Sequence, residues 1–148
     1  MRKTALAVAA MAALGLGASL APVAQASSGL HVTATPLKPA NGHPVTAHIT
    51  GGPPHSKDYL CIFSMYKKGV KATAGLADTP SFTKVTLNKY GAATCHMIFL
   101  KFKVSQKFHG KPLVCPPTRA EKAAGWKCGV AAANFVTRKQ FTFALFKF

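Results

Sequence analysis

Four cysteines carry the best-defined chemistry in this sequence: Cys61, Cys95, Cys115 and Cys128. In an exported chain an even number of cysteines is typical of disulfides, so we expect two of them. Three connectivities are open to four cysteines. The short, proline-bounded loop from Cys115 to Cys128 favours that pair, and Cys61–Cys95 then follows by elimination. No two cysteines have the spacing of zinc ligands, and four free thiols would be unusual in an oxidising compartment.

Groups for acid–base chemistry are scarce. The only acids are Asp58, Asp78 and Glu121, which are too scattered for a paired carboxylate site. The six histidines show no close helical pairing of the kind found in zinc proteases, and the sequence has neither a G-x-S-x-G elbow nor a P-loop. We therefore expect a protein that is not an enzyme and that uses no metal and no cofactor.

The N-terminus predicts export. Arg2 and Lys3 precede an uncharged apolar run over residues 4–20, and Ala24-Gln25-Ala26 supplies a small-x-small cleavage pattern. We expect a signal peptide over residues 1–26, cleaved after Ala26, and a secreted, extracellular protein. A membrane anchor is the less favoured alternative, because glycines and a proline interrupt the run and no positive stop-transfer cluster follows.

The charge of the mature chain is strongly positive. Removing the first 26 of 148 residues leaves 122, suited to one domain over residues 27–148, and lowers the basic count from 19 to 17 against three acids, a net charge of +14. Such an excess predicts attraction to DNA, other polyanions or acidic cell-surface polymers; a solvated surface without a dedicated partner is the alternative. The candidate polyanion contacts are Lys67, Lys68, Lys71, Lys101, Lys103, Lys107 and Lys111.

The cysteines and lysines must be positioned by β-strands, because helical periodicity is almost absent after the predicted signal peptide. The chain there consists of short β-branched and aromatic runs. They are separated by Gly, Pro and Asn, which is typical of an all-β, immunoglobulin-like sandwich of about seven antiparallel strands. The expected strands are Leu30–Thr35, Val45–Thr50, Tyr59–Tyr66, Phe82–Leu87, Ala92–Val104, Trp126–Ala132 and Phe141–Phe148.

Individual patterns refine this prediction. Val45–Thr50 alternates apolar and polar residues, whereas Tyr59–Tyr66 is apolar on both faces, as in a strand that is central or covers a second contact surface. In Ala92–Val104 we expect Leu100, Phe102 and Val104 on one side and Lys101 and Lys103 on the other. Ser105–Pro117 is expected to be irregular, and Thr118 followed by Glu121 has capping-box spacing for one helical turn.

Several motifs resemble the neocarzinostatin family of secreted, seven-stranded β-sandwich apoproteins. The motifs span most of the mature chain: Val32-Thr33-Ala34-Thr35-Pro36, Asn41-Gly42, Val85-Thr86-Leu87-Asn88, Gly91-Ala92-Ala93, Phe108-His109-Gly110 and Cys128-Gly129-Val130. The sequence departs from the family in three respects. Cys61 lacks a nearby partner, the family's polar ligand contacts fall on Gly129 and Ala133, and the chain is basic where family members are acidic.

The resemblance implies a monomeric, non-enzymatic carrier of a small apolar antibiotic chromophore that acts on DNA. We place Phe63, Phe82, Phe108 and Trp126 near a ligand cleft, with a purely structural role in the core as the alternative. A cationic antimicrobial or polyanion-binding protein is a second hypothesis. A protease inhibitor or adhesion module presenting a loop over Lys111–Pro117 is a third, and a membrane-acting toxin using the aromatic segment Phe141–Phe148 is a fourth.

Overall fold

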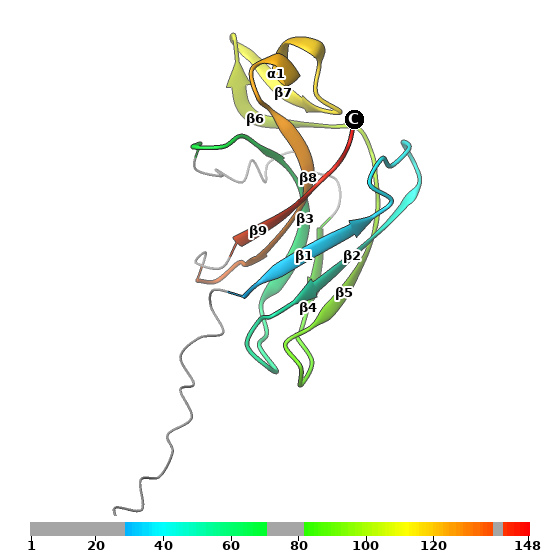
Figure 1. Cartoon of the computed structure of the whole chain (residues 1–148), viewed down its shortest axis with the longest axis vertical. Coiled ribbons are helices and arrows are strands. Elements are labelled where there is room, and N and C mark those ends of the chain that lie inside the picture. Colours follow the sequence, from blue (N-terminus) through cyan, green and yellow to red (C-terminus); the bar gives the residue numbers. More distant parts are fainter. Residues whose placement is uncertain (1–28, 71–81, 138–140) are drawn as a thin grey trace, which may run out of the picture.

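The protein is almost entirely β. The computed structural model describes residues 29–70, 82–137 and 141–148 (Figure 1). The signal sequence predicted over residues 1–26 lies outside these ranges, as does Lys71. The strands are β1 (His31–Thr35), β2 (Pro44–Thr50), β3 (Tyr59–Tyr66), β4 (Phe82–Val85), β5 (Ala93–Ile98), β6 (Phe102–Phe108), β7 (Lys111–Cys115), β8 (Lys127–Asn134) and β9 (Phe141–Leu145), with one short helix, α1 (Arg119–Ala123).

Seven of these strands form a sandwich of two antiparallel sheets. One sheet has the order β1-β2-β5 and the other the order β4-β3-β8-β9, so the chain crosses between the sheets repeatedly. The remaining strands, β6 and β7, form a separate hairpin. Figure 1 shows this hairpin and α1 together at one end of the sandwich. The predicted fold class, an all-β sandwich of about seven strands, is confirmed.

The three-stranded sheet follows the alternation that its sequence predicts. Val45, Ala47 and Ile49 of β2 point into the core, and their neighbours face outward. β1 alternates in the same way, and Cys95 and Met97 provide the buried side chains of β5. One side of this sheet is therefore solvated, as period-two patterning requires.

The predicted single strand Ala92–Val104 is instead two strands in different sheets. β5 ends at Ile98 and β6 begins at Phe102. Between them the Phe99 N–H donates to the His43 carbonyl (2.9 Å), and the Lys101 N–H donates to the Asn41 side chain (2.8 Å). These partners satisfy the backbone outside any ladder, so the chain can turn away from the first sheet.

The break also changes which residues are buried. Leu100, expected to share a face with Phe102 and Val104, is exposed, while Phe99 is buried in the core. Lys101 and Lys103 point to solvent, as predicted.

Residues 105–117 are ordered as a hairpin, which contradicts the prediction of an irregular segment. His109 and Gly110 both have positive φ, 48° and 77°, and they connect the paired residues Phe108 and Lys111. Positive φ at both central residues is the requirement of a type I′ hairpin turn. The His-Gly dipeptide was therefore the signal of this hairpin, and sequence analysis missed it.

Two disulfides join the parts of the fold, and both predicted pairs are confirmed. Cys61–Cys95 links β3 to β5 and therefore one sheet to the other, while Cys115–Cys128 links the hairpin to β8. All four cysteines are buried. Two disulfides in a chain of this size indicate an oxidising compartment.

Candidate ligand-binding site

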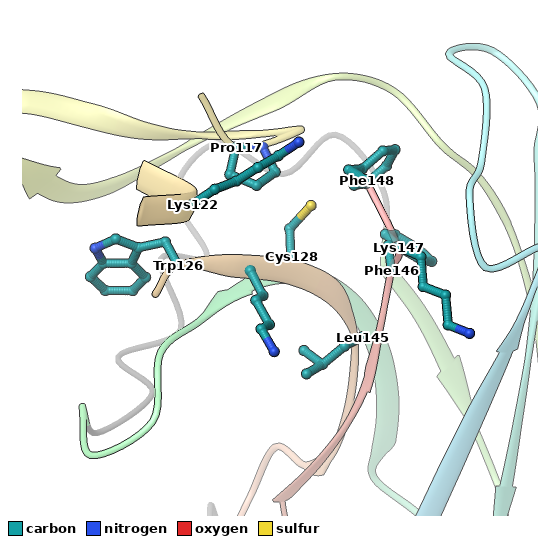
Figure 2. A pocket seen from close by; sticks show the side chains of 9 residues that line it. Pro117, Lys122, Trp126, Cys128, Leu145, Phe146, Lys147 and Phe148 are labelled. Atoms are coloured by element: carbon teal, nitrogen blue, oxygen red, sulfur yellow. The ribbon is translucent and has the colours of Figure 1, made fainter. Parts of the chain in front are cut away.

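A pocket lies where α1, the start of β8 and the residues after β9 meet. Its volume is about 460 Å³. Figure 2 shows Trp126 on one side of it and Phe148 on the other, with Pro117 and Lys122 above and Leu145 below. The complete lining is Pro117, Lys122, Trp126, Lys127, Cys128, Leu145, Phe146, Lys147 and Phe148.

The upper wall is held by a capping box on α1, as the sequence predicted. The Thr118 hydroxyl accepts a hydrogen bond from the Glu121 N–H (3.3 Å), and the Glu121 carboxylate accepts one from the Thr118 N–H (2.6 Å). The other carboxylate oxygen of Glu121 accepts from the Val114 N–H of β7 (3.1 Å). Glu121 is only 4% exposed, and both of its carboxylate oxygens accept backbone hydrogen bonds. The side chain therefore links the helix to the hairpin.

The opposite wall is fixed by the chain that follows β9. The Phe146 N–H donates to the Cys128 carbonyl (2.8 Å), and the Lys147 N–H donates to the Leu37 carbonyl (2.7 Å). The Phe146 ring packs edge-on against Phe148, with ring centroids 5.6 Å apart. Phe148 therefore rests on buried aromatic neighbours and forms a supported wall.

The floor includes Cys128, which forms a disulfide with Cys115 and whose sulfur points away from Leu145 in Figure 2. Trp126 precedes β8 and is 6% exposed, so most of its indole ring is buried in the core. The lining thus combines a disulfide-bonded cysteine in its floor with aromatic residues in its walls.

The electrostatic character of the pocket is positive. Lys122, Lys127 and Lys147 are exposed and line it, and no carboxylate is among the lining residues. Glu121 is adjacent to Lys122 in sequence, but its two oxygens accept backbone hydrogen bonds away from the lining. A fourth cation lies nearby, since the Lys67 Nζ is 5.7 Å from the centre of the Trp126 ring.

The four aromatic residues predicted to share a cleft are not brought together. Of these, Trp126 alone lines the pocket. Phe63 is 1% exposed and packs against Phe99, Phe102 and Phe146, because it lies on the inward face of β3. Phe82 is 55% exposed on β4, and Phe108 is half-buried at the end of β6.

The predicted polyanion contacts fall in two places. Lys101, Lys103, Lys107 and Lys111 are exposed on the β6–β7 hairpin or directly before it. Lys67 and Lys68 follow β3 near the pocket. The segment Lys111–Pro117, expected as an exposed loop, is largely strand β7, and its Leu113 and Cys115 are buried.

Sequence analysis missed Lys122, Lys127, Lys147, Phe146 and Phe148. The alternation Phe146-Lys147-Phe148 indicated an extended segment with aromatic side chains on one face and a lysine on the other. Their convergence, however, depends on the pairing of Gly129 with Leu145 across β8 and β9, which no local pattern predicts.

A second apolar group lies on the outer face of the four-stranded sheet, and we name it the outer cluster. It consists of Leu60, Ile62, Ala131, Phe135 and Phe143. Ile62 lies opposite Ala131, which lies opposite Phe143, so the cluster runs across three neighbouring strands. The unbroken apolar run of β3 predicted such a second contact surface.

Residues 29–70, 82–137 and 141–148 contain no group of three or more His, Cys, Asp or Glu side chains placed to hold a metal ion. No helix among them is long and apolar enough to cross a membrane.

Comparison with protein-family models, with curated proteins and with solved structures finds no match for this chain. The fold and the site together define a small all-β protein, cross-linked by two disulfides, with a pocket at one end of its sandwich.

Proposed function

We propose that this protein is a secreted, non-enzymatic binding protein that holds a small ligand with an apolar body in the pocket beside Trp126. The observation that carries the proposal is the pocket itself: about 460 Å³, with aromatic walls and a disulfide in its floor. Small-ligand sites are typically clefts of roughly 300–1,000 Å³ lined mainly by apolar side chains. The resemblance to neocarzinostatin-type apoproteins implies the same kind of role.

The lining favours binding over catalysis. Its only ionisable side chains are three lysines, and no lining side chain offers a carboxylate, imidazole or hydroxyl to act as a general acid or base. Glu121, the nearest acid in sequence, is committed to two backbone N–H groups. The two disulfides fit a protein that must persist outside the cell with its pocket intact.

The test uses Trp126, which is the only tryptophan of the chain and lines the pocket. Titration with the neutral apolar fluorophore N-phenyl-1-naphthylamine is expected to quench Trp126 emission with saturation at one probe per chain. Leu145→Phe, which adds bulk to the lining, should weaken this binding, whereas Phe82→Leu, outside the lining, should not. Absence of saturable quenching, or equal effects of the two variants, would contradict the proposal.

Native mass spectrometry of protein purified from the medium of its own culture complements this titration. An adduct mass that disappears on denaturation is expected for a carrier and would allow the ligand to be identified. A chain lighter than the sequence from Ser27 to Phe148 by four hydrogens only would show two disulfides and no retained ligand.

A second candidate function, polyanion binding, is favoured by the lysines of the hairpin. Lys101, Lys103 and Lys107 all face solvent. Binding of duplex DNA or of an acidic envelope polymer through them should fall steeply with salt, because released counterions drive such association. Replacing all three by glutamate should abolish binding, and unchanged binding would eliminate this candidate.

A further inference from the structure

We propose that the ligand of the pocket is an anionic amphiphile: an apolar, ring-containing body bearing a carboxylate, sulfate or similar negative group. This inference rests on the proposed function and adds the chemical class of the ligand. Three observations support it: three lysines line the pocket, no carboxylate side chain is among the lining residues, and the Lys67 ammonium group lies beside Trp126.

The three lysines reach the pocket from separate elements. Lys122 is on α1, Lys127 begins β8, and Lys147 follows β9. Lys122 and Lys127 are close in sequence, whereas Lys147 reaches the same pocket only through the pairing of β8 with β9. In Figure 2 the Lys122 side chain extends past Pro117 in the direction of Phe148, whereas the Lys147 side chain points away from Pro117 and Cys128.

No side chain of the lining compensates this charge. The lining contains no carboxylate side chain, and both oxygens of Glu121 accept hydrogen bonds from backbone N–H groups of Val114 and Thr118. In a chain that ends at Phe148, one terminal carboxylate would still leave two of the three positive charges without a partner. An anionic group on a ligand in the pocket is attracted by this local excess of positive charge.

The surroundings of Trp126 select against a cationic ligand. The face of its ring already has the Lys67 ammonium 5.7 Å from its centre. A cationic group on a ligand beside Trp126 would meet this like charge, whereas an anionic group would not. Phe148, on the other side of the pocket, offers an aromatic surface for the apolar body of the ligand.

A matched pair of probes tests the inference. 8-Anilinonaphthalene-1-sulfonate and N-phenyl-1-naphthylamine share one aromatic framework and differ by the sulfonate. We expect the sulfonate to bind about tenfold tighter at 50 mM salt, with the difference shrinking by 500 mM salt as screening increases. Binding of both is followed by quenching of Trp126.

Variants separate the pocket from the general charge of the protein. In the triple variant Lys122→Gln, Lys127→Gln, Lys147→Gln, each exposed lysine removed should weaken sulfonate binding by up to about fivefold, and binding of the neutral probe should be unchanged. The control variant Lys57→Gln, Lys84→Gln, Lys89→Gln removes the same charge outside the lining. It should leave both affinities unchanged.

The outcomes distinguish the inference from the function on which it rests. Equal affinities for the two probes, or equal losses in the two triple variants, would overturn the anionic class and leave the binding function standing. Failure of both probes to bind would overturn the function and the inference together. Selective, salt-sensitive loss in the pocket variant supports both.

Discussion

The outer faces of the two sheets differ in composition, and the difference shows where the molecule concentrates its binding chemistry. On the three-stranded sheet the outward side chains are mainly threonine and histidine. His48 and Thr94 hydrogen-bond through Nδ1 and Oγ1 at 3.0 Å, and Thr46 and His96 lie at 3.4 Å. The outward positions of β1, β2 and β5 carry no lysine, arginine or acid, although the chain as a whole is strongly basic.

The four-stranded sheet has apolar side chains on both faces. Its inner face belongs to the main core, and its outer face carries the outer cluster around Ile62 and Ala131. At the end of β9, Leu145 of the same sheet pairs with Gly129 of β8 and lines the pocket. Three lysines line the pocket beside it. The three-stranded sheet thus has a polar outer face. The four-stranded sheet carries the outer cluster on its outer face and borders the lysine-lined pocket at one end.

The largest expected effect compares one residue from each outer face. Ile62→Ala should cost about 2–5 kcal/mol of unfolding free energy, because Ile62 is 3% exposed and its removal leaves a cavity in the outer cluster. Thr33→Ala, at an exposed position of β1, should cost less than about 1 kcal/mol. Urea unfolding curves of both variants measure the difference, and equal losses would mean that the two faces are energetically alike.

An intermediate effect is expected where the β6–β7 hairpin meets α1. Glu121→Gln replaces one acceptor oxygen by a donor amide, which then faces a backbone N–H. Leaving that donor unsatisfied should cost about 1–3 kcal/mol.

The matched control for this variant is Asp58→Asn. Asp58 is exposed and has a φ of 69°, a conformation that asparagine also tolerates. The cost there should stay within about 0.5 kcal/mol. A comparable loss at both acids, measured by thermal or urea unfolding, would show that total charge and not the capping box governs stability.

Period-two patterns and turn residues allowed most of the sandwich to be predicted. Val45, Ala47 and Ile49 alternate with polar residues, so β2 could be placed and its buried face assigned. The two apolar faces of Tyr59–Tyr66 likewise indicated a strand with a second contact surface. The disulfides followed from loop length and elimination.

The break at Phe99 could not be predicted in the same way, whereas the hairpin turn had a local signal in His109-Gly110 that was overlooked. The run from Ala93 to Val104 remains strand-like in composition throughout, and only the distant Asn41 and His43 provide the partners that let it turn. The pocket depends on pairing between β8 and β9 and on the position of α1, and is therefore a tertiary property. Of the four aromatics proposed for a cleft, Trp126 alone lines it, because the inward face of β3 places Phe63 in the core.

The smallest expected effect concerns the inner face of β3, directly behind the outer cluster. Tyr59 is buried there, and its hydroxyl makes no hydrogen bond of normal geometry in the described part of the chain. Burial raises the pKa of the Tyr59 phenol above its ordinary value of 10.0, and the nearby side chains of Asn134 and Ser56 oppose that shift only in part. Tyr59→Phe should therefore be nearly neutral for stability at pH 7, since it removes an unsatisfied buried group.

The sign of the pH dependence follows from the raised pKa. Above pH 10 the unfolded chain loses the Tyr59 proton before the folded chain does, so the unfolded state binds fewer protons and the unfolding free energy falls as pH rises. Tyr59→Phe lacks this contribution, and its stability relative to the parent should increase between pH 9 and pH 11. Lysine titration is common to both proteins and cancels in the difference. A difference that stays constant with pH would mean that Tyr59 is hydrated, and that the layer between the sheets is less dry than the outer cluster in front of it.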